Sequence, residues 1–183
     1  MRRIINSTYM SLDGLIERME LWHFDYLDDE ATQIQMEDIQ AADAVLMGRG
    51  TYDVFAKAWP TRTGNEMADR FNSMAKYVAS TTLTDPEWNN TTVIDSDLVE
   101  TIAKLKTQPG QDIIMYGFGP VAQTLLENGL LDEIKLWVHP ILVGTGNLSD
   151  MLFSEGSASK LNLVGNRALG SGVVVLTYHP VIA

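Results

Sequence analysis

Residues 117–122 read Gly-Phe-Gly-Pro-Val-Ala, and their chemistry is the most informative in the chain. They follow an apolar run that ends at Tyr116, and a helical pattern continues from them through Leu125. Glycines let a backbone approach a phosphate closely, and the free N–H groups of a first helical turn point toward it. Pro120 suits the first helical position, where no N–H is needed. The stretch therefore predicts a phosphate-binding helix start, with a plain tight turn as the alternative.

This stretch differs from the dinucleotide-binding fingerprint of a Rossmann fold. That fingerprint occupies the first βα turn and has an acidic residue about 20 positions further on, at the end of the next strand. Here the nearest acids, Asp132 and Glu133, come before the next strand. The sequence thus favours a phosphate site of another kind.

Two further stretches place possible hydrogen-bond donors for a phosphate at strand ends. The first follows the apolar run 44–47 and comprises Gly48, Arg49 and Thr51. The second follows another strand pattern and comprises Ser80, Thr81 and Thr82. Arg49 offers a planar fork to a phosphate, and Thr51 can cap a helix or donate a hydrogen bond. An exposed arginine and an ordinary polar loop are the alternatives, but two glycine turns in one chain favour the phosphate site.

Asp13 is the carboxylate most suited to catalysis, because it directly follows an apolar strand in the run Ser-Leu-Asp-Gly. There it could deliver a proton or anchor a substrate, and a turn-forming Asp-Gly pair is the alternative. The histidines, at positions 23, 139 and 179, lack the spacing of metal ligands, and the chain has no cysteine. We therefore expect no metal site and no thiol chemistry.

The charge of the chain limits its partners. With 13 basic and 24 acidic residues, the formal net charge of the 183 residues is −11. A field of this sign repels phosphate, so we expect neither nucleic acid nor an anionic membrane as a partner, and any anionic ligand must be held by local donors. We see no signal peptide and no membrane-spanning run, and we expect a cytoplasmic protein.

The elements that would position these residues alternate between short β-rich runs and helical patterns, which indicates an α/β fold in one domain spanning residues 1–183. Strands are expected over 3–10, 44–47, 76–80, 91–94, 112–116, 133–142, 161–165 and 173–178. Helices are expected over 29–42, from 52 to 59, around 67–74, from 98 to 106 and from 120 to 126. The β-rich last third predicts a mixed sheet with an antiparallel end.

The same third of the chain suggests a homodimer. Ile134, Leu136 and Val138 share one strand face while Trp137 lies on the other, and residues 173–176 are apolar throughout. A strand that is apolar on both faces must be packed against protein on each of them. We expect a partner subunit to supply this packing on one face, at Trp137, and a helix layer of the same chain is the alternative.

Taken together, the order of motifs resembles the dihydrofolate reductase-like superfamily, and above all the reductase domain of the bifunctional riboflavin-biosynthesis deaminase-reductase with its stand-alone relatives. Nearly the whole chain takes part in the resemblance. It is carried by residues 10–14 (Met-Ser-Leu-Asp-Gly), 42–52, 116–119 (Tyr-Gly-Phe-Gly), 130–134 (Leu-Leu-Asp-Glu-Ile) and 139–146 (His-Pro-Ile-Leu-Val-Gly-Thr-Gly).

The resemblance implies a three-layer fold with a mostly parallel sheet, and NADPH lying across the strand ends. It implies that phosphates contact Gly48, Arg49 and Thr51, that the adenosine 2′-phosphate lies near Ser80 and Thr81, and that the pyrophosphate is cradled by Gly117, Phe118, Gly119, Pro120 and Val121. The nicotinamide and a small-molecule substrate would border Asp13, Gly14 and Leu15. It also favours dimers.

The implied activity is an NADPH-dependent reductase that acts on a C=N or C=O bond of a small heterocyclic or sugar-derived compound. The alternative is a non-catalytic nucleotide-binding or assembly module that kept the fold. Two departures bear on the substrate: Leu15 stands where the biosynthetic reductases typically have a lysine, and the helical acids Asp29, Glu37 and Asp38 match the pterin-protonating acid of dihydrofolate reductases by region only.

Overall fold

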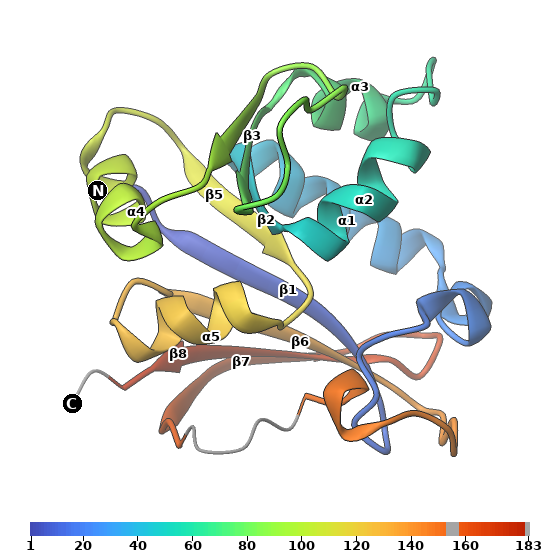
Figure 1. The fold of residues 1–183 in the computed structure, drawn as a ribbon. Helices are drawn as coiled ribbons and strands as arrows, with labels where there is room; N and C mark the ends of the chain where they lie inside the picture. The colour runs from blue at the N-terminus through green and yellow to red at the C-terminus, as the bar shows by residue number, and fades with distance from the viewer. Residues whose placement is uncertain (153–157, 182–183) are drawn as a thin grey trace.

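A computed structural model of the chain describes residues 1–152 and 158–181, and its centre is an eight-stranded sheet of order β4-β3-β2-β5-β1-β6-β8-β7 (Figure 1). The strands are β1 Ile4–Ser11, β2 Ala42–Gly48, β3 Ala75–Ala79, β4 Thr91–Ile94, β5 Asp112–Tyr116, β6 Glu133–His139, β7 Leu161–Ala168 and β8 Val174–Pro180. The strands from β4 to β6 pair in parallel, while β8 is antiparallel to both β6 and β7. The expected mixed sheet with an antiparallel C-terminal end is thus confirmed.

Helices lie on both faces of the sheet (Figure 1). They are α1 Asp29–Ala41, α2 Arg49–Ala58, α3 Glu66–Ser73, α4 Leu98–Thr107 and α5 Pro120–Glu127, with short 3₁₀ helices η1 Met19–Leu21, η2 Phe24–Tyr26 and η3 Leu148–Asp150. One apolar core, with Ile102 of α4 and Leu125 of α5, lies on what we call the α5 face. The other face, which we call the α1 face, carries two clusters that include Ile39 of α1 and Phe71 of α3. No helix among the described residues is long and apolar enough to cross a membrane.

The predicted elements differ from the observed ones mainly at their ends. The strand expected to reach residue 142 stops at His139, because Pro140 has no N–H to donate to a ladder. The strand expected to end at Gly165 continues to Ala168 after an irregularity between Leu163 and Gly165. The 3₁₀ turns η1 and η2 were not predicted, since residues 19–26 show no helical period.

Trp137 does not form the predicted subunit interface. Its side chain is 1% exposed and packs among Ala31 and Ile34 of α1 and Val173 and Val175 of the same chain. Its indole Nε1 donates to the Ser7 hydroxyl at 3.1 Å. Helix α1 therefore supplies the cover that we had expected from a partner subunit.

We expect Trp137→Ala to lower the free energy of unfolding by about 3–5 kcal/mol, because it leaves a large cavity and removes the bond to Ser7. Denaturant titration followed by circular dichroism measures this change. Leu142→Ala is the control: that side chain is 69% exposed, so its loss should cost about 1 kcal/mol or less. Equal costs for the two variants would contradict the assignment of Trp137 to the core.

Candidate functional site

Three parallel strands bring the predicted phosphate-binding turns to one edge of the sheet. Strands β2, β3 and β5 are neighbours, and their C-terminal ends lead into Gly48, Ser80 and Gly117. The first and last of these turns are in contact: a Cβ on Gly48 would lie 3.3 Å from Cγ2 of Val121, and one on Gly117 would lie 3.9 Å from the Thr51 hydroxyl. The edge above these strand ends is where α/β folds commonly bind ligands.

The helices that start at this edge lack the caps that the other helices have. Asp28, Asn65 and Asp97 cap α1, α3 and α4 through side-chain oxygens that accept from backbone N–H groups. Helices α2 and α5 instead follow Gly48 and Gly119, and neither has a side-chain cap. Their first-turn N–H groups and the positive ends of their dipoles are thus available to an anion.

Two buried side chains on β1 hold the turn after β5. Gly117 has φ +74°, a left-handed conformation that suits glycine. Asn6 Nδ2 donates to the Gly117 carbonyl at 2.7 Å, and the Thr8 hydroxyl donates to Asn6 Oδ1 at 2.7 Å. Asn6 and Thr8 are at most 1% exposed. Sequence reasoning missed both, although two polar residues inside an apolar strand could have indicated a role.

Arg49 connects α2 with the loop after β3. Its Nε donates to both carboxylate oxygens of Asp53, at 2.8 and 3.0 Å, and its Nη1 donates to the Thr82 hydroxyl at 3.2 Å. The Ser80 hydroxyl accepts from the N–H groups of Thr82 and Leu83, at 3.2 and 3.1 Å, whereas Thr81 is exposed. The guanidinium is therefore already oriented toward the loop that the sequence assigned to a phosphate.

Asp13 connects the loop after β1 with the loop at residues 143–144 through hydrogen bonds. Its carboxylate accepts from the Ser11 hydroxyl at 2.5 Å and from the backbone N–H groups of Gly144 and Val143, at 2.8 and 3.2 Å. These bonds, with that from Ser11 the strongest, lower the pKa of Asp13 to about 2. A carboxyl group that stays ionised at neutral pH is a poor proton donor, so this geometry favours a role in positioning the loop at 143–144.

The backbone N–H and carbonyl groups of Gly14 and Leu15 form hydrogen bonds with other parts of the protein. The Gly14 N–H donates to Ser11, its carbonyl accepts from Leu152, and Leu15 exchanges two hydrogen bonds with Ser11. The Leu15 side chain is fully buried, against a loop that includes Gly146. Neither residue directs a free donor toward the strand ends.

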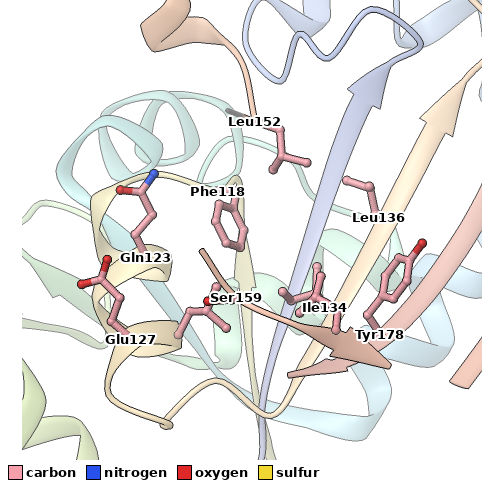
Figure 2. Close-up of a pocket in the computed structure, with 10 residues that line it drawn as sticks. Phe118, Gln123, Glu127, Ile134, Leu136, Leu152, Ser159 and Tyr178 are labelled. Atoms are coloured by element: carbon pink, nitrogen blue, oxygen red, sulfur yellow. The ribbon is translucent and has the colours of Figure 1, made fainter. Parts of the chain in front are cut away.

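The Phe118 side chain points away from the turn into an apolar pocket on the α5 face, which Figure 2 shows. The pocket has a volume of about 180 Å³ and is lined by Phe118, Gln123, Leu126, Glu127, Ile134, Leu136, Leu152, Ser159, Leu161 and Tyr178. A ligand bound at the strand ends could therefore contact only the backbone of Phe118.

Polar and aromatic side chains gather on the α1 face near the ends of β1 and β6. His139 Nδ1 lies 3.0 Å from the Trp137 carbonyl, to which it must donate. Its Nε2 therefore accepts from His23 Nδ1, also at 3.0 Å, and Tyr9 stacks on His23 with ring centroids 4.2 Å apart. Burial lowers the pKa of His139 below its usual value. Burial also lowers the pKa of His23, and with the added effect of the neighbouring His139 that pKa falls to about 4.

Of the three acids considered on α1, Asp38 is the one that faces the sheet. It forms an ion pair with Lys135 of β6, while Asp29 and Glu37 are exposed. Burial raises the pKa of Asp38 in spite of its pairing with Lys135. Among the residues that the structure describes, no group of three or more His, Cys, Asp or Glu side chains could hold a metal ion.

The eight-stranded sheet between two helix layers is the three-layer fold of the dihydrofolate reductase-like superfamily. Dihydrofolate reductase from Enterococcus faecalis, solved in complex with NADP(H), aligns with a TM-score of 0.63 at 11% identity over 97% of this chain and 96% of that chain. A putative riboflavin biosynthesis protein from Shewanella sp. PV-4 aligns with a TM-score of 0.73 at 24% identity over 98% and 99% of the two chains.

Residues 2–175 match the RibD C-terminal domain, and the chain belongs to this family. A curated relative, the uncharacterized protein YyaP of Bacillus subtilis (strain 168), is 30% identical over 182 residues, which cover 97% of this chain and 95% of the relative. The resemblance drawn from the sequence is confirmed, and the family supports a function of the reductase type.

The histidine pair predicts that the fold loses stability as the pH falls from about 6.5 toward 4. Across this window the unfolded chain binds protons that the buried histidines do not, so acid favours unfolding. The midpoint of urea unfolding, measured from pH 7.5 to 4.5, should decrease. The decrease should be smaller in His23→Phe, which keeps a ring beside Tyr9. His179→Gln, at a half-exposed position, should behave like the parent chain. Identical pH profiles for His23→Phe and the parent would contradict the prediction.

Proposed function

We propose that the chain is an NADPH-dependent reductase of the cytoplasm that acts on a C=N or C=O bond of a small heterocyclic or sugar-derived substrate. When bound, NADPH would supply a hydride from its nicotinamide ring. The protein would orient cofactor and substrate against each other and keep water out. The observation that carries this proposal is the pair of uncapped helix starts, α2 and α5, beside Arg49 in a chain of net charge −11.

These residues fit a dinucleotide phosphate. The uncapped N–H groups after Gly119 suit the pyrophosphate, and those after Gly48 suit a second phosphate oxygen. Arg49 with Ser80, Thr81 and Thr82 would hold the 2′-phosphate, because Arg49 is the cation that contacts this loop. Asp13, Gly14 and Leu15 would border the nicotinamide as the framework of the loop.

Arg49→Ala should weaken NADPH binding about 10- to 100-fold, because a charge-assisted contact contributes about 1–3 kcal/mol. NADH, which lacks the 2′-phosphate, should be affected much less. Isothermal titration of both cofactors measures the difference. Lys104→Ala is the matched control: it removes the same charge from the exposed face of α4, where Lys104 pairs with Glu100 at 2.7 Å, and should change neither affinity. A chain that binds neither cofactor at millimolar concentration would refute the proposal.

A non-catalytic nucleotide-binding module is the second candidate, and the engaged carboxylate of Asp13 favours it. The two candidates differ in whether bound NADPH is consumed. Loss of absorbance from the reduced nicotinamide with any member of a panel of pterins, pyrimidines and aldehydes identifies the enzyme. Binding without oxidation across the whole panel favours the module.

We further propose a homodimer that uses the α5 face of the antiparallel end instead of Trp137. The strand registers place Leu136, Leu176 and Leu163 on that face. Leu161 and Leu163 on the edge strand β7 are 40% and 53% exposed. An apolar face that residues 1–152 and 158–181 leave this open suits a second copy.

Leu163→Glu should convert the dimer to a folded monomer, because it places a charge in the proposed interface while the α1-face core stays intact. Sedimentation velocity at micromolar concentration measures the mass, and circular dichroism checks the fold. Leu142→Glu, a change at another exposed leucine on the loop after β6, should leave the dimer unchanged. A parent chain that sediments as a monomer would end the dimer proposal.

A further inference from the structure

Two tyrosines lie on the α1 face directly beside the turn assigned to the cofactor. Tyr116 is the last residue of β5 and immediately precedes Gly117. Its register partner on β1 is Ser7, and Tyr9, two residues further along that strand, lies on the same sheet face. Both tyrosine side chains are partly exposed. They are thus reachable from the edge at which β1 and β5 end.

Both hydroxyl groups have a proton to donate. Gln35 Nε2 donates to the Tyr9 hydroxyl oxygen at 2.8 Å, which uses that oxygen as an acceptor and leaves its proton for another group. Within residues 1–152 and 158–181, neither the Tyr9 proton nor the Tyr116 hydroxyl has a protein partner. Because both side chains are partly exposed, these two hydroxyl protons are available to water or to an acceptor on a ligand.

The surroundings of the hydroxyls suit an uncharged ring. The Phe55 ring lies 5.6 Å from that of Tyr116, and His23 stacks on Tyr9. Lys135, which lies on the same face of the sheet, is already paired with Asp38 and lies 3.9 Å from Glu133. Arg18, on the segment before η1, lies 3.8 Å from Asp150. Both cations are thus close to carboxylates of the protein, so neither of them is free to balance the charge of an anionic substrate.

The protonation of the tyrosines is compatible with hydrogen-bond donation. Removal of water from around the hydroxyls raises the pKa of both Tyr9 and Tyr116, and the charge of Asp38 adds to this effect. Each hydroxyl therefore keeps its proton throughout the neutral range. Such a group polarises a carbonyl or imine by donating to it and does not have to release the proton.

We propose that Tyr9 and Tyr116 donate hydrogen bonds to a carbonyl oxygen or ring nitrogen of the substrate, and that this substrate is an uncharged planar compound without a phosphate or carboxylate group. The inference rests on the proposed function, because it takes the turn after Tyr116 to bring the cofactor to these hydroxyls. It assigns Tyr9 and Tyr116 to substrate binding and leaves Asp38 and Lys135 as a charge-balanced pair beside them.

Binding of two matched probes tests the proposal without requiring turnover. We would first titrate NADPH, and then titrate 2-pyridone and 2-pyridone-4-carboxylate into the chain saturated with NADPH, following both by ligand-observed NMR. The uncharged probe should bind, and the carboxylate should bind at least about 10-fold more weakly. Tyr9→Phe and Tyr116→Phe should each weaken 2-pyridone binding about 5- to 10-fold, as expected for one hydrogen bond, with the NADPH affinity within twofold of the parent.

Tyr77→Phe is the matched control, because Tyr77 packs on the α5 face and should leave both affinities unchanged. Thermal unfolding of each variant checks the fold, and the two tyrosine variants test the proposal independently of each other. The proposal is overturned if NADPH binds but 2-pyridone does not, if the carboxylate binds equally well, or if both phenylalanine variants bind 2-pyridone like the parent. Absence of NADPH binding in the first titration would instead refute the proposed function.

Discussion

The backbone turn at Gly117 is the feature on which the rest of the site depends. Tyr116 before it lies on the α1 face, and α5 after it covers the opposite face, so the chain crosses from one side of the sheet to the other within a few residues. A left-handed φ makes this possible, and the hydrogen bond from Asn6 holds the turn in place. One turn thereby positions both the helix start that we propose for a phosphate and the hydroxyl that we propose for a substrate.

An acidic chain can bind an anion only where its donors are concentrated. The net charge of −11 repels polyphosphates at long range, but screening limits that repulsion to about 10 Å at ordinary salt concentrations. Within that distance the edge of β2, β3 and β5 presents two uncapped helix starts and Arg49. Arg49 is itself held by Asp53, so little side-chain entropy remains to be lost when a ligand binds.

The sequence allowed the fold, the family and the glycine turns at the strand ends to be predicted, because glycine turns and apolar runs are local signals. The role of Asn6 could not be predicted, since it depends on a partner 111 positions away in the chain. Asp13 was interpreted from its place after a strand, but its two backbone donors come from a distant loop. Trp137 was assigned to an interface because no pattern in β6 shows that α1 lies above it.

The place of β1 in the sheet has a consequence for how the chain acquires its structure. This strand precedes the other seven strands in the sequence, yet both of its neighbours, β5 and β6, lie more than a hundred residues further on. Until residue 112 has emerged, β1 has two open edges and no native partner, and the edge that pairs with β6 stays open until residue 133 has emerged. Contacts of such long sequence separation slow folding, since the loop must close before the pairing stabilises it. The centre of the native sheet is therefore the part of the nascent chain that stays unpaired longest.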